Sequence, residues 1–202
     1  MLAAGFLKHG HEAMLGTRDP GKKEVQEWLA QTAGARVGTF KDTAHFGEAL
    51  VLAVAGHAVE SVLDLGGAGN FAGKTLMDAT NPIREEPPVQ GVLKFTTGPN
   101  ESLGEWIQAK MPEAHVVKVF NSVGQGLMVN PQFSQGTPTM FICGDSDQAK
   151  SQVSTILRQF GWEPFDCGGI VSARAIEPLC MLWCLPGFLR NDWQHAFKML
   201  TN

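Results

Sequence analysis

Short apolar runs alternate with longer amphipathic segments along this chain. Residues 50–55 are all apolar, as expected for a strand buried on both faces of a parallel sheet. Residues 102–111 instead carry Leu103, Trp106 and Ile107 at helical spacing, so we expect these three side chains to face inward. The repeated alternation predicts an α/β fold, a Rossmann-like doubly wound parallel sheet with right-handed crossovers and a C-terminal helical region.

The same pattern gives the order of the elements. Strands are predicted over residues 12–15, 36–40, 50–55, 75–79, 115–120, 138–143 and 164–167. Helices are predicted over residues 1–8, 20–33, 42–46, 56–63, 102–111 and 145–160, and from residue 171 onward. We expect a parallel-sheet domain over residues 1–143 and a helical region over residues 144–202.

Helix-end signals refine two of these boundaries. Asp19 is expected to cap the second helix, with Pro20 at its first position and Gly34 after its end. Asp42 is expected to begin the short helix that follows.

Composition narrows the class of protein. The 202 residues are 44% hydrophobic and 18% charged, which suits one globular domain with or without a small helical annex. A net charge of −4 gives no electrostatic sign of a nucleic-acid or anionic-membrane partner. We expect no membrane-spanning helix, because no apolar run reaches the roughly 20 residues that spanning takes, and residues 1–9 lack signal-peptide features. We therefore expect a cytoplasmic protein without a membrane or nucleic-acid partner.

The cysteines and histidines do not indicate a metal site. The chain has no CxxC pair and no HExxH motif. Cys180 and Cys184 share a helix face, but we interpret them, with Cys143 and Cys167, as small apolar residues in a reducing compartment.

Candidate binding residues follow the predicted strands, because ligands of open α/β sheets lie beyond the carboxyl ends of the strands. The residues at these four ends are Thr17 and Arg18; residues 53–57; Thr80, Asn81 and Pro82; and Asn121 and Ser122.

Thr17 and Arg18 stand where NAD-binding folds place a carboxylate for the ribose 2′-hydroxyl. A guanidinium can instead bind a 2′-phosphate through paired, charge-assisted hydrogen bonds. This chemistry favours NADP(H). The alternative interpretation is a surface turn with a solvated arginine.

The other strand ends carry neutral hydrogen-bonding side chains. Asn81 and Asn121 each offer a donor and an acceptor, which suits a nicotinamide amide or a ribose hydroxyl. Each could equally be a turn residue, since Asn-Pro opens turns and Asn caps loops. His57 could be an acid near the ring or a surface histidine at a helix start.

No nucleophile set is evident: we find no clear Ser-His-Asp arrangement, no paired carboxylates in one motif and no reactive-looking cysteine. We therefore assign no catalytic side chain. Hydride transfer fits this absence, because the cofactor carries the chemistry and the protein orients it.

Five segments in this order resemble the NADPH-dependent coenzyme F-420 reductase family, the deazaflavin-dependent type of NADP oxidoreductase. They are LAAGFLKHGHEAMLGTRDP, ALVLAVAGHAVESVL, GKTLMDATNPI, HVVKVFNSV and SARAIEPLCMLW. The family also includes the cytoplasmic domain of six-transmembrane metalloreductases, and the resemblance covers residues 2 to about 200.

The resemblance implies that residues 1–143 are a dinucleotide-binding domain and residues 144–202 a helical substrate and dimer region. It also implies roles for particular residues. Thr17 and Arg18 would bind the 2′-phosphate, and Ala53 and Val54 would lie over the adenosine side. Further site residues would be Asn81, Pro82, Val119 and Asn121, which line the nicotinamide pocket. Arg174 and Glu177 match the start of the helix that closes the substrate side, and family members form dimers through that helical end, whose Trp, Leu and Met content here agrees.

One departure concerns the glycine turn. The family begins with a strand and a GxGxxG turn that hold the pyrophosphate at a helix N-terminus. That segment would lie immediately before Met1, and Gly5 and Gly10 do not replace it. We expect a late start or a truncation, and the alternative is a natural protein that lacks the segment. Without the segment, the sheet lacks its central strand and leaves two edges unpaired, and cofactor binding is much weaker or absent.

Three functions stay open at this point. The first is an NADP(H)-dependent oxidoreductase that passes hydride to a planar acceptor such as a deazaflavin, a flavin or a quinone. The second is a non-catalytic NADP(H)-binding or scaffold protein, which the missing glycine turn favours. The third is a remnant that no longer binds nucleotide.

Overall fold

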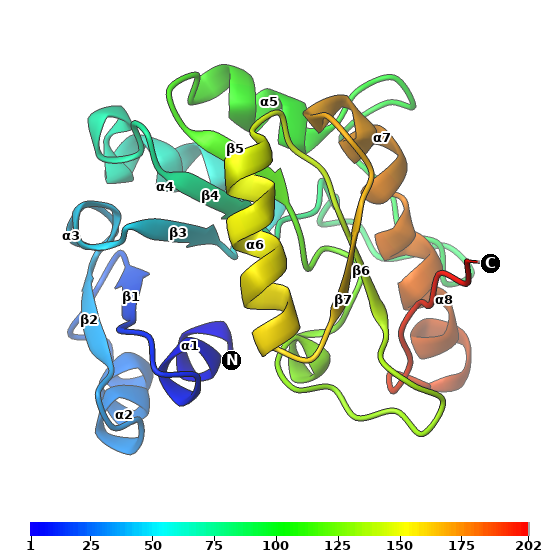
Figure 1. The fold of residues 1–202 in the computed structure, drawn as a ribbon, viewed down its shortest axis with the longest axis horizontal. Helices are drawn as coiled ribbons and strands as arrows, with labels where there is room; N and C mark the ends of the chain where they lie inside the picture. Colours follow the sequence, from blue (N-terminus) through cyan, green and yellow to red (C-terminus); the bar gives the residue numbers. More distant parts are fainter. Residues whose placement is uncertain (202) are drawn as a thin grey trace.

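The computed structural model describes residues 1–201 and has the predicted alternation of helices and parallel strands (Figure 1). The strands are β1 (Met14–Thr17), β2 (Arg36–Thr39), β3 (Ala49–Leu52), β4 (Thr75–Asp78), β5 (His115–Lys118), β6 (Thr139–Ile142) and β7 (Glu163–Asp166). The α-helices are α1 (Leu2–Lys8), α2 (Lys23–Gln31), α3 (Phe40–Phe46), α4 (Val59–Gly66), α5 (Leu103–Lys110), α6 (Asp147–Gln159), α7 (Ala173–Ile176) and α8 (Leu179–Arg190). Short 3₁₀ turns are η1 (Gly56–Ala58), η2 (Ala68–Asn70), η3 (Gln125–Leu127) and η4 (Ile170–Ser172).

The strands form three small sheets, in the orders β1–β2, β3–β4–β5 and β6–β7. All four strand pairings are parallel. A single bridge joins β5 to the end of β6, where the Lys118 N–H donates to the Cys143 carbonyl at 2.9 Å. Because β1 and β3 are not paired with each other, the predicted sheet is divided between them.

The central sheet is covered on both faces. Leu76 and Val116 belong to one apolar cluster, which also contains residues of α4 and α5. Their neighbours Met77 and Val117 belong to a second cluster, which also contains residues of α1 and α6. Alternate residues of a strand therefore point to opposite helical layers, as a doubly wound sheet requires.

Strand β1 begins two residues later than expected. Glu12 lies before the paired segment and its carboxylate contacts Arg36 at 3.0 Å, while the register pairs Met14 with Arg36 and Thr17 with Thr39. Thr17 is therefore the last strand residue, and only Arg18 follows the strand.

The predicted start of the second helix was wrong. The Asp19 carboxylate accepts a hydrogen bond from the Gly21 N–H at 2.9 Å, which holds an Asx turn instead of a helix cap. Helix α2 begins at Lys23. Similarly, Thr39 caps α3, and Asp42 is the third helical residue of a capping box.

Two further expectations differ from the structure. Trp106 is 40% exposed and its ring lies 5.8 Å from the Lys110 ammonium, so it does not face inward with Ile107. The C-terminal region is helical only to Arg190, after which the described chain has no regular structure.

The helical run from Ile170 to Arg190 is long and apolar enough to cross a membrane by length and composition, contrary to the sequence expectation. Core helices of folded domains meet the same criterion. In this run Ala173, Ile176 and Cys180 are buried within the molecule, and 39% of its most apolar window is buried.

Candidate functional site

The carboxyl ends of β4 and β5 are joined by two asparagines. The Asn81 Nδ2 donates to the Asn121 carbonyl at 2.9 Å, and the Asn121 Nδ2 lies 3.4 Å from the Asn81 Oδ1 and 2.9 Å from the Ile176 carbonyl. The Asn121 Oδ1 is buried and, within residues 1–201, has no hydrogen-bond partner. Asn121 therefore links two strand ends to the C-terminal helices and keeps one acceptor free.

The loop after β3 lies directly on the loop after β4. A Cβ added to Gly56 would stand 2.3 Å from the Asn81 carbonyl oxygen, so only glycine allows this approach. Pro82 is buried next to Asn81, and its carbonyl accepts a hydrogen bond from the Thr96 N–H at 2.7 Å. The ends of β3, β4 and β5 consequently form one surface.

The segment after β5 is held in an uncommon conformation. Val119 is fully buried, and its N–H donates to the Asp78 carbonyl at 2.9 Å. Phe120 has a φ of 60°, a left-handed value that bulky residues rarely adopt, although its side chain is buried. Such conformations persist where the surrounding structure fixes them, and they gather at functional sites.

Arg18 lies apart from these asparagines, after β1. It is exposed, and within residues 1–201 no ion-pair or hydrogen-bond partner is found for its guanidinium. Thr17 is half-buried, and its hydroxyl accepts a weak hydrogen bond from the Asp19 N–H at 3.3 Å. The guanidinium is thus free to meet an anion.

A buried ion triad lies beneath the asparagines. The Lys118 Nζ contacts the carboxylates of Asp78 at 2.7 Å and Glu177 at 2.8 Å, and it donates to the Thr80 carbonyl at 3.0 Å. Burial alone would lower the pKa of Lys118, but the two carboxylates hold that pKa above its ordinary value. The ammonium therefore stays charged and ties β4, β5 and the C-terminal region together.

Glu177 also binds the N-terminal end of α5. Its carboxylate accepts hydrogen bonds from the Leu103 N–H at 3.0 Å and the Gly104 N–H at 2.9 Å, which are the first free donors of α5. Glu177 is 1% exposed, so these two bonds hold the start of α5 from inside the molecule.

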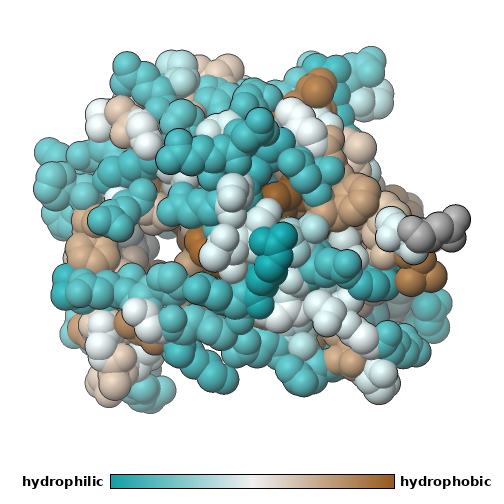
Figure 2. Space-filling view, in the orientation of Figure 1, coloured by the Kyte–Doolittle hydropathy of each residue, from teal (hydrophilic) through white to brown (hydrophobic). Residues whose placement is uncertain are grey.

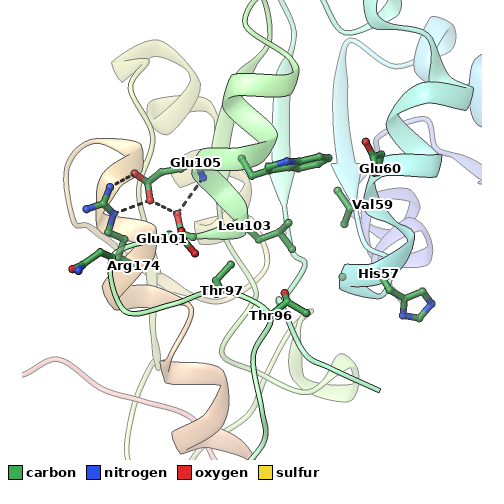
Figure 3. A pocket seen from close by; sticks show the side chains of 13 residues that line it. His57, Val59, Glu60, Thr96, Thr97, Glu101, Leu103, Glu105 and Arg174 are labelled. Atoms are coloured by element: carbon green, nitrogen blue, oxygen red, sulfur yellow. Dashed lines mark hydrogen bonds and ion pairs between the residues drawn. The ribbon is translucent and has the colours of Figure 1, made fainter. Parts of the chain in front are cut away.

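A cavity of about 660 Å³ opens beside this surface (Figure 3). On one side, Arg174 forms a bidentate ion pair with Glu105, with N–O distances of 2.7 and 2.9 Å. This ion pair and the Ser102 hydroxyl lower the pKa of Glu105. His57 stands on the opposite side, with Leu103 between them. The cavity thus combines polar groups with an apolar wall.

The structure brings most of the predicted site residues to this end of the sheet. Ala53 and Val54 follow β3 and line the groove that separates β3 from β1. His57 is exposed at the cavity and lies 3.5 Å from the Glu85 carboxylate. We find no group of three or more potential metal ligands in residues 1–201.

Sequence reasoning missed Asp78 and Lys118. Each is a charged residue at the end of a strand whose two central residues are apolar. A fully buried charge must be paired, so two opposite charges at adjacent parallel strand ends were a usable signal of mutual contact.

The fold and this site define the class as a Rossmann-like α/β protein with its candidate site at the carboxyl ends of β3, β4 and β5. The profile of the family described as NADP oxidoreductase, coenzyme F420-dependent, matches residues 1–82. A solved structure from Arthrobacter sp. FB24, assigned as an F420-dependent NADP reductase, is 31% identical with a TM-score of 0.92; the match covers 99% of this chain and 93% of that one. The chain belongs to this family of NADP-dependent oxidoreductases.

Two other proteins extend the comparison. The rat metalloreductase STEAP3 is 30% identical over 198 residues, which are 93% of this chain but 36% of the relative. The chain thus spans about a third of the length of the curated relatives that it matches. A reductive aminase from Aspergillus terreus, solved with NADPH, shares the fold at 18% identity and a TM-score of 0.63, over 94% of this chain and 58% of that one.

Proposed function

We propose that the chain binds NADP(H) across the carboxyl ends of its strands and passes a hydride between the nicotinamide and a planar redox acceptor. The observation that carries this proposal is the junction of Gly56, Asn81 and Asn121 at adjacent strand ends. When bound, the nicotinamide supplies the hydride chemistry, and the protein contributes orientation.

The residues present fit this cofactor in two respects. The unpartnered, buried Asn121 Oδ1 can accept a hydrogen bond from an amide, and it is held in place by the bond from Asn121 Nδ2 to Ile176. The exposed Arg18 guanidinium matches the charge of a 2′-phosphate. Thr17 and Arg18 would hold the phosphate, and Ala53, Val54, Asn81, Pro82, Val119 and Asn121 would line the rest of the site.

The cavity beside the ion pair of Arg174 and Glu105 is the proposed acceptor side. Its wall includes the exposed Trp106 ring, on which a flat ring can stack. Deazaflavins, flavins and quinones share this flat shape, and the acceptor belongs to this class in our proposal.

The proposal is tested by titrating the protein with NADPH and with NADH and following fluorescence. NADPH oxidation is then measured with deazaflavin, flavin, quinone and ferric acceptors. We expect tighter binding of NADPH than of NADH, and turnover with at least one planar acceptor. No binding of either nucleotide contradicts the proposal.

A second candidate is a non-catalytic NADP(H)-binding or scaffold protein. The division of the sheet between β1 and β3 favours it, because the 2′-phosphate residues lie on the separate β1–β2 unit. Tight NADPH binding without oxidation by any of these acceptors would select this candidate.

We also propose a homodimer that forms through α8. Leu182, Phe188 and Leu189 are 53%, 44% and 56% exposed on this helix. Exposed apolar side chains on one helix are typical of an interface.

A further inference from the structure

The chain reverses its direction after α8. Asn191 has a φ of 55°, a left-handed value that ends the helix, and residues 191–199 return along α8 (Figure 1). We call residues 191–199 the strap. The Trp193 ring lies against Gly187, where an added Cβ would stand 2.3 Å from it, so only glycine allows this approach. The Trp193 Nε1 donates to the Asn191 Oδ1 at 3.1 Å, which holds the turn.

The strap covers part of an apolar helix. In Figure 2, apolar side chains show on the right of the molecule, where Figure 1 places α8 and the strap. The Trp193 ring meets the Phe188 ring edge-on, with centroids 5.3 Å apart, and Phe188 stays 44% exposed. Burying apolar surface stabilises by about 25 cal/mol per Å², which favours the return of the strap along α8.

The far end of the strap is fixed on β6 and β7. The Thr139 N–H donates to the Phe197 carbonyl at 2.9 Å, and the Thr139 hydroxyl accepts a hydrogen bond from the Met199 N–H at 3.0 Å. The Lys198 ammonium pairs with the Glu163 carboxylate on β7. These contacts give the strap one course, although it has no regular structure.

Between its two ends, the strap holds the side chain of Trp183. The Trp183 Nε1 donates to the His195 carbonyl at 2.8 Å, and the His195 Nε2 donates to the Trp183 carbonyl at 2.8 Å. The two rings lie 5.0 Å apart, and the Trp193 ring lies 5.7 Å from that of Trp183. Trp183 is 6% exposed, so its indole is fixed by two hydrogen bonds and two neighbouring rings.

The Trp183 indole contacts the loop that carries Asn121. An added Cβ on Gly124 would stand 2.5 Å from the indole Cη2, so the ring lies directly on the loop backbone. The two residues between Asn121 and Gly124 are Ser122 and Val123, and both are buried. Because a packed interior transmits small displacements, a shift of the ring moves the side chain that offers the unpartnered Oδ1.

We propose that the strap is a positioning element for the nicotinamide end of the proposed NADP(H) site, and that it acts on Asn121 through Trp183. The inference rests on the proposed function, in which Asn121 accepts a hydrogen bond from the nicotinamide amide. Arg18 follows β1, whereas the strap contacts α8, β6 and β7. The strap should therefore affect the nicotinamide end and leave the 2′-phosphate end unchanged.

The first test measures the loop without nucleotide. Trp183→Leu removes the ring that contacts Gly124, whereas Trp183→Phe keeps a ring and loses only the bond to the His195 carbonyl. Amide exchange over residues 119–127 should accelerate by about tenfold or more in Trp183→Leu and by less in Trp183→Phe. Exchange in β3 and β4 should stay unchanged in both variants, which separates a local effect from general loss of stability.

The second test separates the two ends of the nucleotide. NADPH and adenosine 2′,5′-bisphosphate, which lacks the nicotinamide half, are titrated by calorimetry against variants in the strap. His195→Ala should weaken NADPH binding by about tenfold and change bisphosphate binding by less than about twofold. His195→Gln, whose amide can donate to the same carbonyl, should bring NADPH binding to within about threefold of the wild type. His115→Ala, at the exposed start of β5, is the matched control and should change neither affinity.

Equal losses for NADPH and the bisphosphate overturn the proposal, because the strap then supports the fold as a whole. Unchanged exchange over residues 119–127 in both Trp183→Leu and His195→Ala overturns it as well. Absence of NADPH binding by the wild-type protein contradicts the proposed function, while exchange over residues 119–127 still decides whether the strap holds this loop.

Discussion

At the scale of single residues, Arg18 carries the choice between nucleotides. Its guanidinium is exposed, and we find no partner for it within residues 1–201. We expect Arg18→Glu to weaken NADPH binding by about 10- to 100-fold, since a hydrogen bond to a charged group contributes about 1.5–3 kcal/mol. NADH binding should change by less than about threefold. Fluorescence titration measures both constants, and Arg158→Glu, on the exposed side of α6, is the matched control. Equal losses for the two nucleotides would remove Arg18 from the phosphate site.

Among the charged residues, Lys118 should lower the free energy of unfolding most when it is replaced. Lys118→Met leaves the buried carboxylates of Asp78 and Glu177 without their cation, and breaking a buried pair costs about 3–5 kcal/mol. Urea unfolding at neutral pH measures this loss. Lys110→Met, at an exposed ion pair on α5, should cost far less.

The raised pKa of Lys118 leads us to predict how the stability of the protein depends on pH. The folded pKa of this lysine lies above the ordinary value of 10.5, so its contribution to stability is complete below about pH 10.5 and is lost as the pH rises through the folded pKa. Between about pH 8 and 10, this contribution should therefore be constant. A Lys118→Met protein should lack the part of the alkaline loss that comes from this group. Unfolding curves across the alkaline range test this; an unchanged alkaline profile in the variant would contradict it.

The cysteines should differ in reactivity. Burial raises the pKa of the Cys143 thiol to about 12, whereas the neighbouring Cys180 thiol lowers the pKa of half-buried Cys184. Because the thiolate is the nucleophile, an alkylating reagent at about pH 8 should modify Cys184 first and leave Cys143 unmodified until the protein unfolds. Peptide mass spectrometry identifies the modified site. In Cys184→Ser, this first modification should disappear.

At the scale of elements, the contact between the loops after β3 and β4 forms the centre of the site. Gly56→Ala forces a Cβ to within 2.3 Å of the Asn81 carbonyl, and overpacking of this kind costs about 1–3 kcal/mol. We expect a lower Tm and weaker nucleotide binding. Gly69→Ala is the matched control, since an added Cβ there meets nothing within 4 Å. If Gly56→Ala binds nucleotide as tightly as the wild type, this contact does not contribute to the nucleotide site.

Sequence periodicity predicted an element and its start correctly where a single local signal determines them. The helix predicted over residues 102–111 is α5, which Ser102 caps, and β4 and β5 begin at the predicted residues. It failed where two local signals compete: the Asp19 side chain can cap a helix or close an Asx turn, and the turn prevails. Trp106 was assigned inward because spacing alone cannot show that the Lys110 side chain accompanies it at the surface.

For the candidate site, the sequence predicted which strand ends meet but not the contacts beneath them. The rule that ligands lie beyond carboxyl ends located Asn81 and Asn121, and the structure joins them. The pairing of Glu177 with Lys118 could not be predicted, because residues 177 and 118 meet only after the C-terminal helices fold back over β5. The division into regions 1–143 and 144–202 stays a prediction, although β6 and β7 pair across that boundary.

At the scale of the whole molecule, the exposed face of α8 predicts association. Phe188 and Leu189 are about half exposed. Burying apolar surface in an interface stabilises a complex by about 25 cal/mol per Å². We expect the wild-type protein to elute as a dimer at micromolar concentration, and Leu189→Glu to shift it toward the monomer by placing a charge in the interface. Light scattering coupled to size exclusion measures the mass.

The matched control is Leu65→Glu, because Leu65 is 51% exposed on α4 and Leu189 is 56% exposed on α8. A dimer that survives Leu189→Glu but dissociates with Leu65→Glu would move the interface to α4. The Leu189 side chain lies close to Gly91, where an added Cβ would be 3.2 Å from it. We therefore expect loss of the dimer to disturb the loop that leads to Thr96 and the cavity. Acceptor KM should then rise in the monomer, as steady-state kinetics would show.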